Sequence, residues 1–255
     1  MLYDSPLARA ALRSCVGRKH RLRPVFSFQG IELRTIAYVD GYNLFFGCLR
    51  GTPYKWLDVH ALLKEVLRVQ DPDSELVCVK YFTAPIRESF ARRGQEAANA
   101  QGGYLRALKS RGGLYVFEGR FSAEPTNAIC YADPPDKDKR VRVWRLEEKQ
   151  TDVAIAIAMY RDAVRGEVDQ VLLVSNDSDM VPAIRALKAD TKVRVGMVFA
   201  LPEPDAPNHD RRPNAELAEL ADWHRRHVRN DELAAAQLPR VVQTKRKPVH
   251  KPAYW

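Results

Sequence analysis

Short apolar runs alternate along the chain with segments whose apolar residues recur every three or four positions. The runs are rich in Val, Ile, Leu, Tyr and Phe, which is typical of strands buried on both faces. The predicted strands cover residues 35–40, 76–82, 114–119, 171–176 and 193–199. The predicted helices cover residues 58–69, 88–110, 147–165 and 179–189, and a short helix follows Asn214. This alternation predicts an α/β fold, a three-layer sandwich whose central, mostly parallel sheet of about five strands carries helices on both faces.

The same pattern divides the chain into three parts. Residues 1–34 mix Arg, Lys and Ser without clear periodicity, and we interpret them as a basic N-terminal extension. Residues 35–222 hold all the predicted strands and helices and form one domain, while residues 223–255 lack a period and read as a basic C-terminal tail. Within the domain, residues 121–146 contain two adjacent prolines and a charged run, which predicts an exposed loop that returns through an extended piece and serves as a lid or an insertion.

Composition limits the class of protein. A chain of 255 residues with 45% hydrophobic residues can bury one full core. Its four cysteines are widely spaced without a C-x-x-C pair, which argues against a zinc site and a disulfide framework. The chain has neither a run of 18 apolar residues nor an apolar segment behind its basic start, so we expect a soluble cytoplasmic protein that does not enter a membrane.

The net charge of +9 is concentrated at the two ends of the chain. Residues 1–34 carry seven Lys or Arg against two acids, and residues 239–255 carry five against none, which leaves the middle close to neutral. A near-neutral body with basic ends suits a polyanionic partner such as a nucleic acid. The alternative is that both ends are disordered segments that only solubilise the protein.

Four acidic residues lie where predicted strands end or a buried helix begins. Asp40 closes the first strand, Asp177 and Asp179 follow the fourth, and Asp152 precedes eight uncharged residues. Ligands of parallel sheets bind at the carboxyl ends of the strands, so these carboxylates should converge there. Clustered carboxylates repel one another unless a hard cation neutralises them, which predicts a Mg²⁺ or Mn²⁺ site held by all four.

Polar neighbours of these acids are candidates for supporting roles. Asn43 could hold a metal ligand or contact a phosphate, Glu148 precedes Asp152 by four residues and would share its helix face, and Ser175 and Asn176 could orient a carboxylate or the attacking water. Each acid also has a structural alternative. Asp152 could be an ordinary acid of a helix N-terminus, and one acid of the Asp-Ser-Asp turn could serve only as a helix cap.

Basic residues near the second strand and near the C-terminus are candidates for phosphate contacts. The first group follows the second predicted strand and the other lies in the basic C-terminal segment; their members are Arg87, Arg92 and Arg93, and Lys245, Arg246 and Lys247. Such side chains would grip the backbone of a nucleic acid. A solvated helix face explains the first group equally well.

Three segments resemble, in the same order, the signatures of NYN domains, a branch of the PIN-like nuclease superfamily: Val39-Asp40-Gly41-Tyr42-Asn43-Leu44, Glu147-Glu148-Lys149-Gln150-Thr151-Asp152-Val153 and Val174-Ser175-Asn176-Asp177-Ser178-Asp179. The ending His250-Lys251-Pro252-Ala253 also resembles that of bacterial members. The resemblance implies a PIN-like, Rossmannoid sheet, an acidic Mg²⁺ or Mn²⁺ site and, in most members, cleavage of RNA. The chain departs from the common Glu-Lys-Gly-x-Asp form at Gln150.

We therefore expect a metal-dependent ribonuclease that hydrolyses single-stranded RNA, with Asp40, Asp152, Asp177 and Asp179 as catalytic residues and metal ligands. Three alternatives remain open. A phosphatase of the haloacid-dehalogenase type would need a second Asp where this chain has Tyr42. A nucleic-acid-binding regulatory module could keep the acids without cleaving. A nuclease could also act on DNA, because no residue in the sequence reports on the 2′-hydroxyl.

Overall fold

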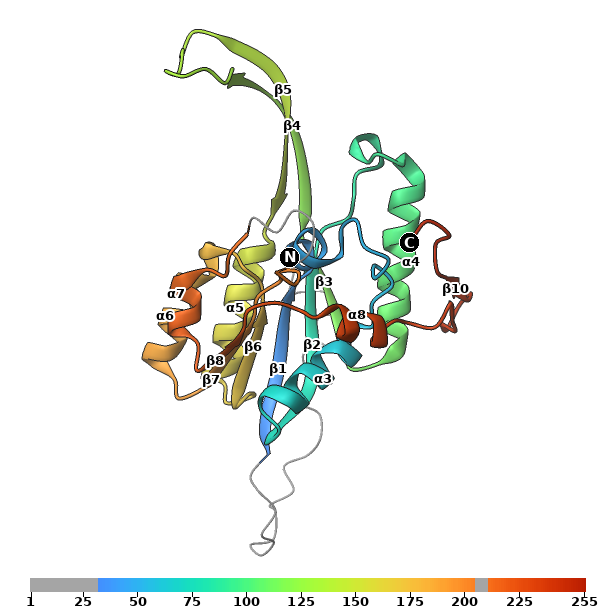
Figure 1. The fold of residues 1–255 in the computed structure, drawn as a ribbon, viewed down its shortest axis with the longest axis vertical. Helices are drawn as coiled ribbons and strands as arrows, with labels where there is room; N and C mark the ends of the chain where they lie inside the picture. Colours follow the sequence, from blue (N-terminus) through green and yellow to red (C-terminus); the bar gives the residue numbers. More distant parts are fainter. Residues whose placement is uncertain (1–31, 205–210) are drawn as a thin grey trace, which may run out of the picture.

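A computed structural model describes residues 32–204 and 211–255 of the chain (Figure 1). Its centre is a six-stranded sheet with the order β3-β2-β1-β6-β7-β8, in which every neighbouring pair is parallel. The strands are β1 (Leu33–Asp40), β2 (Ser74–Thr83), β3 (Leu114–Glu118), β6 (Gln170–Val174), β7 (Arg194–Val198) and β8 (Trp223–Arg225). The predicted α/β fold is confirmed. Residues 1–31 of the predicted extension lie outside the described residues.

Helices cover both faces of this sheet. They are α2 (Gly41–Leu44), α3 (Val59–Gln70), α4 (Gly94–Arg111), α5 (Thr151–Val164), α6 (Val181–Asp190), α7 (Ala215–Leu220) and α8 (Asn230–Ala235). Three short helical turns accompany them: η1 (Phe45–Leu49), η2 (Glu88–Phe90) and η3 (Ser178–Met180). The helices α3, α4 and α8 pack on one face and α5, α6 and α7 on the other, so the fold has three layers.

Alternation along the strands divides the apolar residues between two cores. In β1, Ala37 and Val39 face the core under α3 and α4, whereas Ile36 and Tyr38 face the core under α5 and α6. These side chains are almost completely buried. Because both faces are covered, the strands read as continuous apolar runs, which is the pattern that the sequence shows.

The order of the strands fixes where a site can form. Strand order reverses between β1 and β6, which are neighbours in the sheet although far apart in the chain. The two connections leave this point in opposite directions and open a crevice at the carboxyl ends of the strands. Asp40 is the last residue of β1, and Asp177 follows β6 by three residues. The fold therefore places both acids at the switch point.

Residues 121–146, expected as a loop, instead form most of a long antiparallel ribbon. β4 (Arg120–Ile129) pairs with β5 (Arg140–Lys149) in continuous register. The ribbon projects beyond the body from the edge of the sheet where β1 ends (Figure 1). The predicted return through an extended piece is confirmed by β5, whereas the loop expected before it was wrong. Residues 121–129 form a strand that pairs with this return, and only residues 130–139 at the tip lie outside the two strands.

Two helix boundaries and the C-terminal segment also differ from expectation. The predicted helix over residues 88–110 is divided into η2 and α4, and the helix predicted from residue 147 begins at Thr151 because the preceding residues pair within the ribbon. Residues 223–255, expected as a tail, contribute β8 to the sheet, α8, and a small hairpin of β9 (Val241–Val242) and β10 (Val249–His250). Trp255 packs against Trp56, which anchors the chain end to the body.

Three cysteines of the described residues, Cys48, Cys78 and Cys130, are free thiols. No helix in residues 32–204 or 211–255 has the length and apolar character needed to cross a bilayer.

Candidate metal centre

Asp40 reaches the edge of the sheet because β1 ends in a tight turn into α2. Its Oδ1 accepts a hydrogen bond from the backbone N–H of Asn43 at 2.9 Å and so caps the helix. The turn needs glycine at position 41, since a Cβ there would lie 2.7 Å from both the carbonyl oxygen of Phe82 and the ring of Tyr81. Asp40 is only 5% exposed, so the charge is held in a largely dry position.

Asp152 lies in the first turn of α5, a helix that is buried along most of one side. The chain enters this helix through Gln150, whose φ of 77° is in the left-handed region. That turn joins the end of β5 to the start of α5, close to the carboxyl end of β1. Asp152 remains half-buried there, so it is more than a solvated acid at a helix N-terminus.

Asp177 combines the two roles that the sequence left as alternatives. Its Oδ1 accepts a hydrogen bond from the backbone N–H of Asp179 at 3.0 Å, which caps η3. Its carboxylate also belongs to the acidic cluster. Asp179 lies on the exposed side of the same turn and is not part of the close set, although its charge raises the pKa of Asp152.

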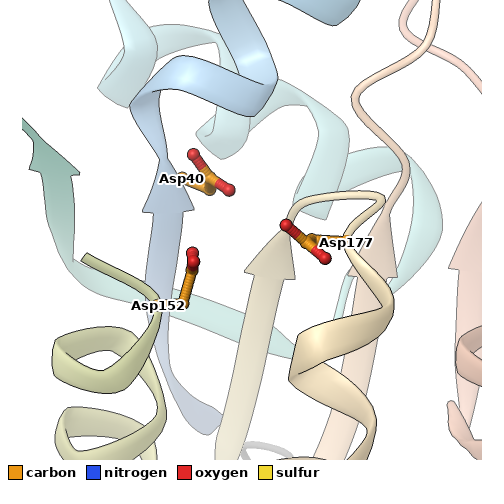
Figure 2. Close-up of side chains that lie close together, drawn as sticks. All are labelled: Asp40, Asp152 and Asp177. Carbon is orange, nitrogen blue, oxygen red and sulfur yellow. The ribbon is translucent and has the colours of Figure 1, made fainter. Parts of the chain in front are cut away.

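Three carboxylates converge at this edge. One oxygen from each of Asp40, Asp152 and Asp177 lies within 4.8 Å of the others. Figure 2 shows the three side chains extending toward a common point from the end of β1, the start of α5 and the loop after β6. Within the described residues this is the group of acidic, histidine or cysteine side chains whose ligand atoms come close enough to hold a metal ion.

The electrostatics of the cluster are those of a site that lacks positive charge. Burial raises the pKa of Asp40 to about 6, and the charges of Asp152 and Asp177 add to the rise. Burial also raises the pKa of Asp152, with further contributions from Asp177 and Asp179. The charged neighbours that shift these acids are all other carboxylates, so within residues 32–204 and 211–255 no cation neutralises them.

This arrangement fits a hard divalent cation. Carboxylate oxygens are the ligands that Mg²⁺ and Mn²⁺ prefer, and both ions usually keep several waters in addition to a few protein ligands. Three acids around one point leave room for such waters, and a bound cation would relieve the repulsion that raises the pKa of Asp40. The donor set therefore suits Mg²⁺ or Mn²⁺.

The expected supporting residues hold the cluster in different ways. The Ser175 hydroxyl donates to Oδ2 of Asp40 at 3.4 Å and accepts from the backbone N–H of Asp177 at 3.1 Å. The side chain of Asn43 accepts from the backbone N–H of Asn176 at 3.1 Å, so it connects the end of β1 to the loop after β6. Both residues fix the positions of the carboxylates rather than offering a further ligand.

Asn176 has a different partner from the one expected. Its side chain donates to the carbonyl of Arg212 at 3.0 Å and accepts from the backbone N–H of Asn214 at 2.8 Å. It thereby holds the segment that precedes α7 against the end of β6. Sequence reasoning did not connect Asn176 with Asn214, because residues distant in the chain come together only through the order of the strands.

Glu148 lies at the base of β5 and not on the helix of Asp152, yet it faces the same site. Its carboxylate accepts a hydrogen bond from the Thr151 hydroxyl at 2.6 Å, a contact that the sequence did not reveal. Burial raises the pKa of Glu148 to about 7, and the charges of Asp40 and Asp152 contribute to the rise. Glu148 is thus a fourth acid of the site, and its pKa lies near neutral pH.

The basic residues expected to contact phosphates lie at two places. Arg87, Arg92 and Arg93 are exposed on the segment between β2 and α4, which leaves the same edge of the sheet as the acidic cluster. Arg93 already has two partners in the protein. Its Cζ lies 4.2 Å from the ring centroid of Tyr254, and its guanidinium group pairs with the Glu96 carboxylate at 3.1 Å.

The second basic group lies away from the cluster. The exposed residues Lys245, Arg246 and Lys247 form the turn between β9 and β10. Figure 1 shows this hairpin beyond α4, separate from the ends of β1 and β6. The structure therefore does not bring these three residues to the acidic site.

A parallel three-layer α/β fold with carboxylates at its switch point is consistent with the class of PIN-like nuclease domains. The profile of the NYN domain matches residues 34–215, which is most of the chain. The chain belongs to the NYN domain family.

The protein is similar to the 6-hydroxy-3-succinoylpyridine 3-monooxygenase HspA of Pseudomonas putida (strain DSM 28022 / S16), with 38% identity over 243 residues. That match covers 88% of this chain and 75% of the relative. Among solved structures, a protein of unknown function from Vibrio parahaemolyticus RIMD 2210633 matches with a TM-score of 0.46 and 16% identity, covering 80% of this chain and 98% of that one.

Proposed function

We propose that this protein is a metal-dependent ribonuclease that hydrolyses phosphodiester bonds of single-stranded RNA and acts in the cytoplasm. The observation that carries the proposal is the convergence of Asp40, Asp152 and Asp177 within 4.8 Å at the strand-order switch. Family membership supports it, because NYN domains are a branch of the PIN-like nucleases.

In this proposal the three aspartates hold one or two Mg²⁺ or Mn²⁺ ions. A bound divalent ion supplies a nucleophilic water at neutral pH and neutralises charge on the transferring phosphate. The chain contributes the geometry: Ser175 fixes the carboxylate of Asp40, and the capped turn at η3 fixes that of Asp177. Asp179, exposed beside Asp177, adds negative charge and is an outer ligand in the proposal.

Glu148 has a role of its own. Its pKa of about 7 lets it hold or release a proton near neutral pH, and its hydrogen bond to Thr151 keeps its carboxyl group at the rim of the site. We assign it to proton transfer or to orientation of the attacking water. Because the proposed reaction is a direct hydrolysis, it requires neither a covalent enzyme intermediate nor a nucleophilic side chain.

The test is incubation of the protein with end-labelled single-stranded RNA and with DNA of the same sequence, in Mg²⁺, in Mn²⁺ and in chelator. We expect RNA to be cut with either metal, with no cutting in chelator. Cleavage of DNA but not of RNA would show that the protein is a deoxyribonuclease instead. Binding of either strand without cleavage under all conditions would support a regulatory module instead.

A second candidate function comes from the name of the Pseudomonas relative, which describes oxygenation of a substituted pyridine. In doubly wound sheets a dinucleotide cofactor binds where the strand order reverses, and in this protein its pyrophosphate would meet three carboxylates there. Charge therefore favours hydrolysis. The two functions are distinguished by measuring oxygen consumption with 6-hydroxy-3-succinoylpyridine and a reduced nicotinamide dinucleotide. Consumption of oxygen and of both compounds, without cleavage of RNA, would support the oxygenase.

A further inference from the structure

The β4–β5 ribbon is the part of the described structure with the least support from the body. Its strands pair only with each other, over ten residues each, and it stands out from the edge of the sheet that carries the acidic cluster (Figure 1). A two-stranded ribbon with both faces in water is marginal by itself. A projection of this kind is better explained by a ligand that it contacts than by its own stability.

The register of the ribbon assigns its side chains to two faces. Successive residues of a strand point in opposite directions, so every second residue of β5 shares a face. The first face, here called the cluster face, carries Glu148, Leu146, Trp144, Arg142 and Arg140. The second, the outer face, carries Lys149, Glu147, Arg145, Val143 and Val141.

Glu148 shows that the cluster face leads to the acidic site. It is the innermost of the five residues, and its carboxylate accepts a hydrogen bond at 2.6 Å from the hydroxyl of Thr151, the residue before Asp152. From Glu148 outward, the six residues to Arg142 span roughly 20 Å at about 3.3 Å per residue. A continuous surface therefore runs from the candidate metal centre to the middle of the ribbon and beyond.

The charges on the two faces differ in their pairing. On the outer face, Glu147 pairs with Arg145 at 3.7 Å and with Lys149 at 3.0 Å, so the charges largely cancel. On the cluster face, Arg140 binds only backbone carbonyls, those of Lys137 and Asn127. Neither Arg140 nor Arg142 forms an ion pair with another described residue, so both guanidinium groups are available to an anion.

An aromatic side chain lies between these arginines and the acidic site. Trp144 is 58% exposed, and its ring lies 5.3 Å from that of Phe90 in an edge-to-face arrangement. Phe90 belongs to the segment that carries Arg87 and Arg92. The cluster face and this segment therefore present an exposed indole flanked by cationic groups on both sides.

We propose that the cluster face of the ribbon binds a single strand of nucleic acid and leads it into the acidic site, with a base stacked on Trp144 and phosphates bound by Arg142 and Arg140. This proposal rests on the proposed function. An exposed aromatic side chain next to two cations suits the bases and phosphates of a single strand, whose unpaired bases are free to stack. A duplex would keep its bases stacked within the helix and leave the indole without a partner.

The experiment measures the affinity of a fluorescently labelled 16-nucleotide single-stranded RNA by anisotropy, in chelator, so that binding is recorded without cleavage. The variants are Arg142→Ala and Trp144→Ala on the cluster face, with Arg145→Ala and Val143→Ala as matched controls on the outer face. We expect each cluster-face variant to bind about tenfold more weakly. Arg142→Ala should also reduce the slope of log affinity against log salt by about 0.7, and the controls should leave affinity and slope unchanged.

Circular dichroism and thermal melting of each variant show whether the ribbon and the body remain folded. Equal losses from variants of both faces, or no loss from either, would overturn the proposal. So would a concentration-dependent dimer of the wild-type protein, seen by sedimentation and abolished by Trp144→Ala, because the occupant of the face would then be a second copy of the chain. A protein that binds RNA as expected but never cleaves it with Mg²⁺ or Mn²⁺ would support this binding surface and contradict the proposed function.

Discussion

Two acidic residues of the same helix, Asp162 and Asp152 of α5, have opposite surroundings. Asp162, near the end of α5, is completely buried, and it pairs with the ammonium group of Lys80 and accepts a hydrogen bond from the Tyr38 hydroxyl at 2.6 Å. Asp152, at the start of α5, faces other carboxylates, those of Asp177 and Asp179. Among the residues that the structure describes, Asp162 has a counter-charge, and the charged neighbours that shift the pKa of Asp152 are all acids.

The difference shows which acid serves the fold. A buried charge without a partner is strongly destabilising, so a carboxylate with a purely structural role needs its cation close by. The fold supplies Lys80 for Asp162. At the carboxyl edge it supplies further acids instead; burial raises the pKa of Asp40 to about 6, and these acids add to the rise. We propose that a cation from solution completes such a site.

The largest expected effect is on cleavage. Asp40→Asn and Asp177→Asn should each reduce cleavage of single-stranded RNA on the order of 1,000-fold, because an amide keeps the shape of the carboxylate but loses the charge that holds the ion. Melting in chelator should stay the same or rise, since the repulsion is relieved. The matched control is Asp190→Asn, at the exposed C-terminal end of α6. Full activity in both site variants would show that the acidic cluster takes no part in cleavage.

The second effect is on stability and concerns the compensated acid. Lys80→Met should lower the free energy of unfolding by about 3–5 kcal/mol, because it leaves the buried Asp162 with only the Arg161 guanidinium, 3.7 Å away, as a cation. Urea denaturation measures the change. Lys188→Met breaks the half-exposed pair with Asp222 and should cost less than about 1 kcal/mol. Similar losses of unfolding free energy in the two variants would mean that burial does not set how much each ion pair contributes to stability.

The third effect is the pH dependence of the metal-free protein. The folded state raises the pKa of Asp40 to about 6 and that of Glu148 to about 7, so it holds these protons more tightly than the unfolded state. The contribution of these two acids to stability is therefore fully present at low pH and is lost as the pH rises from about 4 through about 7, on the order of 3 kcal/mol for Asp40. Denaturation in chelator at several pH values tests this. A slope that persists unchanged in Asp40→Asn would assign the effect to other groups.

The smallest effect concerns the turn that positions Asp152. Gln150 has a φ of 77°, a conformation that a residue with a side chain adopts at a cost. Gln150→Gly should raise stability by about 1 kcal/mol without changing the cluster. Thermal denaturation measures the gain. A loss of stability would show that the Gln150 side chain makes a contact that outweighs the strain.

Much of the acidic site was predictable because it depends on sheet topology. Asp40 and Asp177 follow apolar runs, and parallel strands bring their carboxyl ends to one edge. The position of Asp179 outside the close set was not predictable, because it depends on a single turn of η3 that Asp177 caps. The contact of Thr151 with Glu148 was also hidden, since it requires the chain to change direction at Gln150.

The extended return of the ribbon was expected, but its pairing with β4 and the structure of the C-terminal segment were missed for another reason. In β5 the alternation of Arg and Val over residues 140–143 is typical of a strand. Nearly every residue of β5 is exposed, however, so the strand has no buried apolar face by which a sequence pattern could place it in the fold. The end of the chain has no period at all. It is held by tertiary packing of Trp255 against Trp56 and Tyr104, which no local pattern records.

Calorimetric titration of Mn²⁺ into the metal-free protein tests most directly whether the acidic cluster is completed by a cation. We predict saturable binding by the wild-type protein and by the Asp190→Asn control, and a rise in melting temperature that corresponds to about 2.7 kcal/mol when the free ion is at 100 times its Kd. Asp40→Asn should lose most of this binding while remaining folded in chelator. No heat and no change in melting at millimolar Mn²⁺ and Mg²⁺ in the wild-type protein would contradict the account, and the three aspartates would then be structural acids.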